Sequence, residues 1–475
     1  MGWRPLRDDL PLQVLLLQLL AATVVTAGVP KPVSNQGRSL NISAPEAHQV
    51  VQRQKNNTGK FSVEGTLQID CDLVEVRLVP IDVQGQTAGD PADWAVLIKT
   101  ASSGSAFIRA IEGEAGWYRL EFRVTWQKSA YPRHILHNIT PVGIGEVFIT
   151  AGQSNSANFG ERPTSPKDPR VSAWGCPWSW SSWWVYPVLT DGCIPAWQIA
   201  HDPQPLATGV LGSPWPALRD ILAERFDVPI AFISVGWGST SVAQWAPTTP
   251  SGQHSKPYQR LLWALQTVGN RGVRAILWHQ GESDAIKKHV TALEYANELN
   301  DIIAATRRDT GWDVAWFVAR IGYHPAVGNE RWQAIVDGQQ MVIDGDRRSF
   351  EGPFTDDMVG DRWRWDRVHW SLAGLAELAK RWNQTINLGI APVAGQYLHL
   401  PTELPSFTPT HVPSMAPTSI PSVEPTASPS QHAQPSPFSS RKREEEEANS
   451  CNRSTSSGAA VVTAVILVVA AVFFH

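Results

Sequence analysis

Two hydrophobic rhythms follow one another along the chain. Between residues 59 and 138, apolar and polar positions alternate in short runs such as 74–78 and 118–124, and Gly, Pro and Asp separate the runs. A period of two predicts strands that bury one face, and several short strands without a helical pattern are typical of a β-sandwich. We therefore expect a smaller, β-sandwich-like domain within residues 28–144.

From residue 145 the rhythm changes to apolar runs that alternate with helical patterns. The apolar, β-rich runs are 146–150, 229–235, 273–278 and 313–321. The helical patterns are 214–226, 257–268, 285–308, 330–343 and 372–387. Because alternating strands and helices build a parallel sheet covered on both faces, residues 145–390 are predicted to form a three-layer, doubly wound α/β domain.

The first residues carry a targeting signal. Arg4 and Arg7 precede an apolar run at 14–25, and small residues lead up to Ala27. These features are typical of a secretory signal peptide, predicted as residues 1–27, and they place the protein in the secretory pathway. A transmembrane anchor is the alternative, but the apolar run is short for one.

The C-terminal segment has two unlike parts. Residues 391–458 are predicted to be a stalk and charged spacer, because Pro recurs at every fourth position from Pro401 and such a repeat cannot bury a core. Residues 459–474 are uncharged and mostly apolar, and at about 1.5 Å per residue they reach ~24 Å, short of the ~30 Å hydrocarbon core. We expect residues 459–475 to be a glycosylphosphatidylinositol (GPI) attachment signal that leads to the cell surface, with a tail-anchored span as the alternative.

Charge, cysteines and glycosylation signals refine this picture. A net charge of -4 over 475 residues gives no reason to expect a nucleic-acid partner. Cys176 and Cys193 are predicted to form a loop-closing disulfide in an oxidising compartment, whereas Cys71 and Cys451 lie in different segments and cannot be paired from the sequence. N-glycosylation is expected at the Asn-X-Ser/Thr sequons of Asn41, Asn56, Asn138, Asn383 and Asn452.

Polar, glycine-bearing turns follow the first three predicted strands of the α/β domain. Their residues are 152–155 (GQSN), 236–240 (GWGST) and 279–284 (HQGESD). Ligands bind outside the carboxyl ends of the strands in open α/β sheets, so the three turns are predicted to share one rim. Ser154 is either a nucleophile on this rim or the polar cap of the next helix.

A carboxylate and an imidazole stand close together near the end of the domain. Asp366 precedes His369 by three residues, just ahead of the helical pattern at 372–387. This spacing lets the carboxylate accept from one ring nitrogen while the other nitrogen faces a serine, which is how an acid orients a catalytic base. The alternative is a surface loop in which the two side chains share no role.

Together, the segments GQSN, VGWGSTSVAQW, WHQGESD and DRVHWSLAG, in this order, resemble the SGNH-hydrolase superfamily. More narrowly, they look like its sialate O-acetylesterase and acetylxylan-esterase-like carbohydrate esterases, over about residues 145–388. The resemblance implies an SGNH/flavodoxin-like fold and carbohydrate O-acetylesterase activity through an acyl-enzyme. It also implies an O-acetylated carbohydrate as substrate, with neither a metal nor an organic cofactor.

The same resemblance implies a role for each matching residue. Ser154 would be the nucleophile, His369 the general base and Asp366 the group that orients the base. The backbone N–H groups of Ser154 and Gly238 and the side-chain amide of Gln280 would form the oxyanion hole, whose fixed donors stabilise the developing alkoxide.

The chain departs from the pattern of these relatives at three positions. Ser156 follows GQSN where Met is frequent, Ser239 replaces the second glycine of a Gly-Gly-Thr turn, and His279 stands where an aromatic such as Tyr is usual. None removes a proposed catalytic group, so they bear on substrate choice. His279 and His324 are rival bases, the first expected beside the site and the second expected to be structural or at its rim. Glu282 either holds the loop of the neighbouring Gln or is a plain structural carboxylate.

Tryptophan is the most unusual component of the composition, with 22 Trp against 7 Tyr. Many of them fall in the Pro-broken segment 173–197, which fits neither a helix nor a strand. Either indole faces stack against sugar rings there, or the loop packs a small core of its own. On the first interpretation the substrate-binding residues are Trp178, Trp180, Trp183, Trp184, Trp237 and His279.

Two alternatives to a glycan esterase stay open. A catalytically silent surface lectin or adhesin would keep the fold and bind glycans through the aromatic loop. It would have no chemical reason to keep Ser154, His369, Asp366 and Gln280 together. An esterase of non-carbohydrate esters is the lesser alternative.

Overall fold

The computed structural model describes residues 39–126, 133–168, 170–176, 195–287 and 290–387, all of which belong to one compact unit. The predicted signal peptide (1–27), the stalk (391–458) and the C-terminal signal (459–475) lie outside the described residues. The predictions for those three segments therefore stay predictions.

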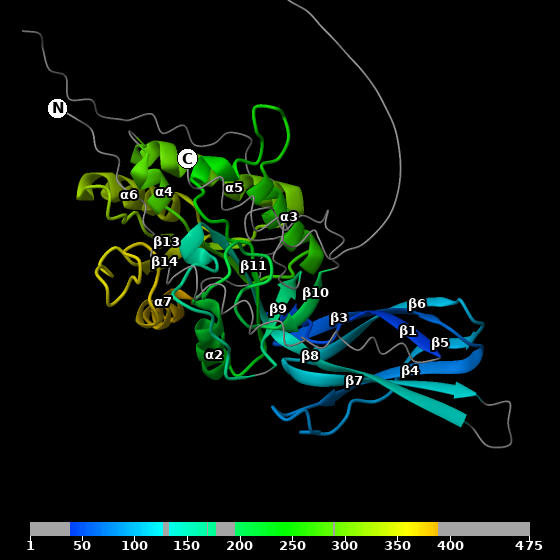
Figure 1. The fold of residues 1–475 in the computed structure, drawn as a ribbon. Helices are drawn as coiled ribbons and strands as arrows, with labels where there is room; N and C mark the ends of the chain where they lie inside the picture. The colour runs from blue at the N-terminus through cyan, green and yellow to red at the C-terminus, as the bar shows by residue number, and fades with distance from the viewer. Residues whose placement is uncertain (1–38, 127–132, 169, 177–194, 288–289, 388–475) are drawn as a thin grey trace, which may run out of the picture. The chain divides into compact units, whose positions relative to one another are not determined.

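Two layers of strands form the N-terminal part (Figure 1). One is a three-stranded antiparallel sheet of β1 (Leu40–Ala44), β3 (Thr58–Leu67) and β6 (Ala106–Glu114). The other contains β5 (Ala95–Ala101), β4 (Cys71–Pro80), β7 (Gly116–Trp126) and the first part of β8 (Arg133–Gly152), and β2 (Val50–Gln52) pairs in parallel with β8. Alternate side chains from both layers, such as Phe61 and Val76, enter one buried cluster, which agrees with the period of two in the sequence.

Strand β8 belongs to both parts of the molecule. Its first part pairs antiparallel with β7, and its last residues pair in parallel with β11 (Ile230–Ser234) and β12 (Ala275–His279). The predicted boundary between residues 144 and 145 therefore falls inside a continuous strand. The rhythm of the sequence changes there because β8 is mostly exposed up to residue 140 and fully buried from Val142 onward.

The central sheet of the second part is parallel from β9 to β14, in the order β9-β11-β8-β12-β13-β14. A further strand, β10, pairs antiparallel with β9 at one edge. The sequence did not predict β9 (Ser172–Gly175), β10 (Ala196–Ile199) or β14 (Ser349–Phe354), while β13 (Ala315–Arg320) falls within a predicted run. β9 and β10 are only four residues long, and β14 contains Pro353, which is tolerated because β14 is an edge strand.

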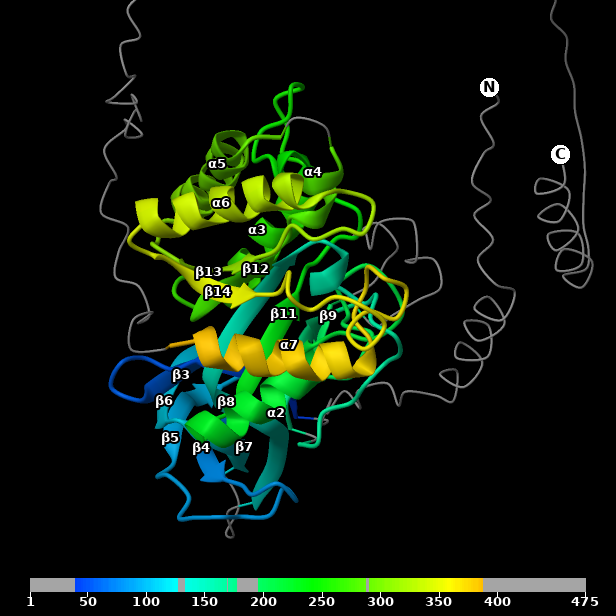
Figure 2. The same cartoon turned by 90° about the vertical axis from the view of Figure 1, so that its left-hand side faces the viewer.

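Helices cover both faces of this sheet, which is the predicted three-layer α/β arrangement (Figure 2). On one face lie α2 (Trp215–Phe226) and α7 (Leu372–Thr385), and on the other lie α3 (Lys256–Val268), α5 (Ala292–Thr310) and α6 (Asn329–Gly345). Successive strand residues alternate between the two cores. Phe232 and Leu277 pack under α2 and α7, whereas Ile233 and Trp278 pack under α3 and α5.

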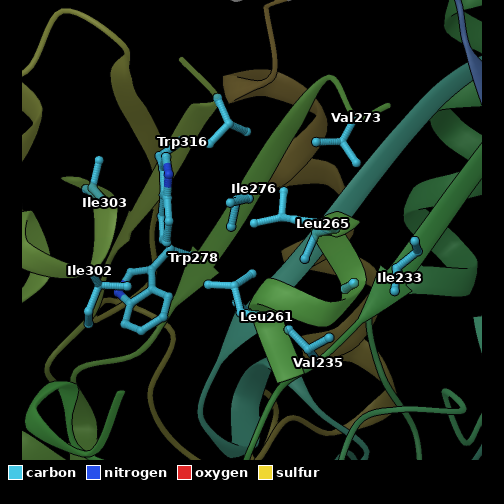
Figure 3. Packing of buried hydrophobic residues seen from close by; sticks show 14 of the residues in the cluster. Ile233, Val235, Leu261, Leu265, Val273, Ile276, Trp278, Ile302, Ile303 and Trp316 are labelled. Atoms are coloured by element: carbon cyan, nitrogen blue, oxygen red, sulfur yellow. The ribbon is translucent and has the colours of Figure 1, made fainter. Parts of the chain in front are cut away.

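The core beneath α3 and α5 is rich in large side chains (Figure 3). Leu261 and Leu265 of α3 belong to the same buried cluster as Ile302 of α5, and all three are at most 1% exposed. Trp278 and Trp316 lie on adjacent strands with ring centroids 5.8 Å apart. Because protein cores are close-packed, the ends of these strands are held firmly, and so are the turns that follow them.

The predicted helix at 285–308 is wrong as a single element. α4 (Glu282–Ile286) ends before α5 begins at Ala292, and Thr291 is the N-cap of α5. The Thr291 hydroxyl accepts from the N–H of Glu294, and the Glu294 carboxylate accepts from the N–H of Thr291, which is a capping box. A capping box marks a helix start, so the sequence contained a signal that a new helix begins after Thr291. The continuous apolar pattern of 285–308 concealed that signal.

Candidate active site

Ser154 lies on a sharp turn directly after β8. The strand ends at Gly152, and Ser154 begins the short 3-10 helix η1 (Ser154–Ser156). Gly152 has a φ of +126°, and a Cβ there would stand 2.0 Å from the carbonyl oxygen of His279, so only glycine fits. The N–H of Gln153 donates to the same carbonyl at 3.0 Å, which ties the turn to the end of β12. Ser154 is therefore part of a strand-end turn and does not cap an α-helix.

Asp366 and His369 form a hydrogen-bonded pair in the loop before α7. The His369 Nδ1 and the Asp366 Oδ2 are 2.6 Å apart, and the Asp366 Oδ1 accepts the N–H groups of Val368 and His369 at 2.9 and 2.6 Å. Burial alone would raise the pKa of Asp366, but the hydrogen bond and charge of His369 and the two N–H groups lower it below its usual value. Because an ionised carboxylate only accepts, Nδ1 carries the proton and Nε2 is left as the basic nitrogen.

The loop before α7 that contains Asp366 and His369, here called the histidine loop, packs against the segment that carries Ser154. The ring of His369 stacks on Phe159, with centroids 5.4 Å apart and an interplanar angle of 24°. The side-chain amide of Asn155 donates to the carbonyl oxygen of Val368 at 3.3 Å. The structure thus brings the neighbours of Ser154 and His369 into contact across a sequence separation of 213 residues.

Two of the predicted oxyanion donors have protein acceptors in this structure. The N–H of Gly238 donates to the hydroxyl of Thr208 at 2.7 Å. The side-chain amide of Gln280 donates to the side-chain oxygen of Gln153 at 3.2 Å and to the carbonyl oxygen of Thr240 at 3.1 Å. An oxyanion would have to take the place of these acceptors, so the oxyanion hole stays a prediction.

Gln280 is fully buried at the end of β12 and is held from several sides. Its amide also donates to Asp284, and its side-chain oxygen accepts from the Tyr295 hydroxyl at 2.9 Å. Asp284 in turn accepts the N–H of Val242, the first residue of η4 (Val242–Trp245), at 2.9 Å. Burial raises the pKa of Asp284, against the effect of these hydrogen bonds. Gln280 therefore fixes the rim of the site, as expected of a side chain at a rigid strand end.

Three polar residues at this rim were not predicted to take part in the site: Gln153, Asn155 and Thr208. The side-chain oxygen of Gln153 also accepts the N–H of Ser283 at 3.0 Å, which joins the serine turn to α4. Gln153 and Asn155 flank Ser154, and this adjacency is the feature of the sequence that could have indicated their part in the site. Thr208 had none, because it lies in a loop 30 positions from the N–H that it accepts.

Two buried ionisable residues, one acidic and one basic, adjoin the segments of the site. Glu282 and Arg364 are both fully buried. Burial raises the pKa of Glu282, while burial lowers the pKa of Arg364 to about 10, against the opposing charges of Glu282 and Asp356. The Arg364 guanidinium donates to the carbonyl oxygens of Met358 at 2.8 Å and Val368 at 2.5 Å. Glu282 itself accepts from the side-chain amide of Asn155 at 2.7 Å, and the choice between its two predicted roles stays open.

The two rival histidines lie in different places. His279 is fully buried, with its ring 6.1 Å from that of Trp370, and burial followed by the charge of Arg364 lowers its pKa to about 3. His279 has no exposed surface in this structure, and its predicted role in substrate binding stays a prediction. His324 is half-buried, and its pKa is lowered by burial and then by the charge of the nearby His369, which agrees with a place at the rim.

The described part of the aromatic segment is core. Trp174 and Trp197 are 5% and 7% exposed, and Trp174 packs against Trp263 with ring centroids 4.7 Å apart. Trp237 is covered by the guanidinium of Arg260, 4.2 Å from the ring centroid. The remaining predicted sugar-contacting residues, Trp178, Trp180, Trp183 and Trp184, lie outside the described residues, and their role stays a prediction.

Only two of the four cysteines lie among the residues that the structure describes. Cys71 is a buried free thiol, and Cys176 is not a free thiol. Cys193 and Cys451 lie outside the described residues, so the pair Cys176–Cys193 stays a prediction.

The predicted glycosylation sites differ in their exposure. Asn41, Asn56 and Asn138 are exposed, and all three lie in the N-terminal part. Asn383 is half-buried, and its side-chain oxygen accepts from Arg225 at 3.1 Å. Asn452 lies outside the described residues.

Within the ranges that the structure describes, no group of three or more His, Cys, Asp or Glu side chains is arranged to hold a metal ion. The same residues include no helix that is both long and apolar enough to cross a membrane.

A family model described as carbohydrate esterase, sialic acid-specific acetylesterase matches residues 144–386. The chain belongs to this carbohydrate esterase family. The match confirms the relationship that the sequence motifs predicted, and the matched segment contains Ser154, Gly238, Gln280, Asp366 and His369.

Individual relatives of this carbohydrate esterase are distant. A probable carbohydrate esterase of Arabidopsis thaliana is 27% identical over an alignment of 190 residues. The match covers 36% of this chain and 66% of that protein, just under two thirds of its length. A crystal structure of a carbohydrate acetylesterase from Xanthomonas citri has 16% identity and a TM-score of 0.43, covering 73% of this chain and 74% of the other. An Arabidopsis thaliana protein structure has 20% identity and a TM-score of 0.36, covering 50% and 96%. These two structures are too dissimilar to bear on function.

Proposed function

We propose that the chain is a secreted, surface-anchored carbohydrate O-acetylesterase of the sialate O-acetylesterase type, with Ser154 as its nucleophile. The observation that carries the proposal is the Asp366–His369 pair at 2.6 Å, in a loop that contacts the residue next to Ser154. An imidazole oriented by a carboxylate activates a serine on a strand-end turn for attack on an ester when the two come within hydrogen-bond reach.

The proposed reaction has two steps. The Ser154 oxygen attacks the acetyl carbonyl while the Nε2 of His369 takes the hydroxyl proton, and the sugar alcohol leaves with that proton. Water then gives a proton to the same nitrogen and attacks the acetyl-serine. The Ser154 oxygen takes that proton from His369 as it leaves, which releases acetic acid and restores the free enzyme. Asp366 stabilises the imidazolium in both steps.

The negative charge on the acetyl oxygen needs fixed donors. The N–H groups of Ser154 and Gly238 and the amide of Gln280 are proposed for this role. Gly238 becomes available when the Thr208 hydroxyl turns away from its N–H, a rotation about one bond. Gln280 has to exchange one of its protein acceptors for the oxyanion.

The decisive test compares the wild type with Ser154→Ala. Acetate release is measured from O-acetylated sialic acid, acetyl-xylan and p-nitrophenyl acetate. We expect the substitution to reduce turnover by ~10⁴-fold or more, because the nucleophile is lost. Wild-type turnover in a folded Ser154→Ala protein would refute the mechanism, and the order of the three substrates tests the proposed sialate preference.

A catalytically silent glycan-binding protein is the second candidate. It is favoured by the engagement of Gly238 and Gln280 with protein acceptors. Absence of acetate release from every substrate, together with binding of the same glycans by calorimetry, would replace the esterase by this alternative.

Surface anchoring is a separate part of the proposal, supported by the short apolar segment 459–475. We expect that mass spectrometry of the mature protein finds no peptide from this segment and that a phosphatidylinositol-specific phospholipase releases the protein from cells. Detection of residues 459–475 in the mature chain would favour a spanning tail.

A further inference from the structure

Asn155 lies between the two segments that carry the proposed catalytic groups. It follows Ser154 in the chain, is 2% exposed, and donates from its side-chain nitrogen to two acceptors. One is the Oε1 of Glu282 at 2.7 Å, and the other is the carbonyl oxygen of Val368 at 3.3 Å. Because both partners accept only through oxygen, the amide of Asn155 has one satisfactory orientation.

The Val368 carbonyl is one of the points at which the loop that carries His369 is held. It also accepts from the guanidinium of Arg364 at 2.5 Å. Val368 immediately precedes His369, so a shift of this carbonyl moves the base. Among the described contacts of Ser154's immediate neighbours, the bond from Asn155 is the one that reaches this carbonyl. This bond therefore links the residue after Ser154 to the residue before His369.

Glu282 holds the other side of the Asn155 amide. It is fully buried in α4, and its Oε1 accepts from Asn155. Its Oε2 and the Oδ1 of Asn155 are both buried and have no hydrogen-bond partner among the described atoms. Burial raises the pKa of Glu282, against the charges of Arg364 and His369, and Asp356 is a further carboxylate nearby. Asn155 donates to a single oxygen of Glu282, and an uncharged side chain with a carbonyl oxygen, such as glutamine, supplies the same acceptor.

We propose that Asn155 is a positioning residue that fixes Ser154 against His369 by binding the Val368 carbonyl, and that one side-chain oxygen of Glu282 orients Asn155 for this task. The inference rests on the proposed function, since it presumes that Ser154 and His369 react together. It adds two residues to the proposed site, one from the serine turn and one from α4, neither of which touches substrate.

The test uses Asn155→Ala, Glu282→Ala and Glu282→Gln in the full chain, with p-nitrophenyl acetate as substrate. Misplacement by about 1 Å costs up to ~10²-fold in rate, so we expect kcat to fall ~10- to 100-fold in the two alanine variants while KM changes little. Glu282→Gln keeps an oxygen for Asn155 and should stay within about threefold of the wild type, since a loss of that size is small against the expected effect.

Asn158→Ala is the matched control. Asn158 is a fully buried asparagine on the same segment, but its amide binds the carbonyls of Gln204 and Ala207 and does not reach the histidine loop. We expect Asn158→Ala to lower Tm at least as much as Asn155→Ala, because it removes more hydrogen bonds, while kcat stays close to that of the wild type.

Two outcomes would overturn the inference: a wild-type kcat in folded Asn155→Ala, or equal losses in Glu282→Gln and Glu282→Ala. The rate at which a fluorophosphonate labels Ser154 gives a second measurement that needs the activated serine but no glycan. Labelling of Asn155→Ala at the wild-type rate would contradict this inference alone. Labelling of the wild type without acetate release from any glycan would contradict the carbohydrate function alone.

Discussion

Asp356 is a carboxyl group whose ionisation is opposed by its surroundings. It is 5% exposed and accepts the N–H groups of Gly322 and Tyr323 at 3.0 Å each. Burial raises its pKa from 3.8 to about 7, although the two N–H groups work in the other direction. The folded state therefore holds this proton more tightly than the unfolded state, and the group's contribution to stability falls as pH rises from about 4 to about 7.

We predict that Asp356→Asn stabilises the protein at pH 8 and changes little at pH 4. Asparagine keeps an oxygen for the two N–H groups but cannot ionise, so it removes a penalty of up to about 4 kcal/mol at pH 8. Thermal melts of the variant and the wild type at both pH values measure the difference.

The neighbouring Asp357→Asn serves as a control of opposite sign. The hydrogen bond from Arg381 lowers the pKa of Asp357, so its contribution to stability is present at pH 8 and is lost as pH falls. This variant should melt below the wild type at pH 8. A lower Tm at pH 8 for Asp356→Asn as well would show that its carboxylate is stabilising, contrary to the expectation.

The residues of the candidate site that could be predicted from the sequence are those with local signals. Ser154 follows a strand and a glycine, and Asp366 stands three positions before His369, so neighbours in the chain revealed them. The contacts of Asn155 with Val368 and of Gly238 with Thr208 join residues 213 and 30 positions apart. No single-chain pattern reports such pairs, because only the folded sheet brings their loops together.

At the scale of elements, the sequence predicted the strands and helices that have a regular apolar pattern. It missed strands that are short or interrupted by proline. The buried strands β11, β12 and β13 lie within or overlap the predicted apolar runs, since strands covered on both faces are continuously apolar. The edge strands β10 and β14 escaped prediction because an edge strand has one neighbour and tolerates polar residues or proline.

Among the buried strands, β12 does most to position the turns of the candidate site. The end of β12 places Trp278 in the core and Gln280 at the rim, and the carbonyl of His279 between them binds the serine turn. A strand buried on both faces has little freedom to shift, so the turn inherits its position. This explains why the rim could be located from the sequence although its individual hydrogen bonds could not.

At the scale of the whole molecule, one buried ion cluster joins the two parts. Glu146 on β8 is fully buried and binds Arg53 at 2.7 Å and Arg274 at 2.7 and 2.8 Å. It also accepts from Gln52 at 2.8 Å. Arg53 and Gln52 belong to the N-terminal part and Arg274 precedes β12, so a single carboxylate binds residues on both sides of the predicted boundary.

We predict that Glu146→Gln destabilises the protein by about 3–5 kcal/mol, because it leaves the buried guanidinium of Arg274 without its counter-charge. The free energy of unfolding is measured by urea titration, followed by tryptophan fluorescence. Glu121→Gln is the matched control, since Glu121 binds Arg77 and Arg119 within the N-terminal part and is more exposed. Equal small losses in the two variants would show that the cluster at Glu146 contributes no more than a surface pair.

Strand β8 has a consequence for recombination between the two parts of the chain. Its first half completes the N-terminal sheet, and its last residue stands two positions before Ser154. Recombination that exchanged the N-terminal part for another module would have to splice a new half-strand onto β8 in register. A one-residue error in that splice would turn every following side chain to the opposite face and misplace the serine turn. A crossover within β8 therefore keeps the serine turn in place only where the new half-strand continues the strand in register.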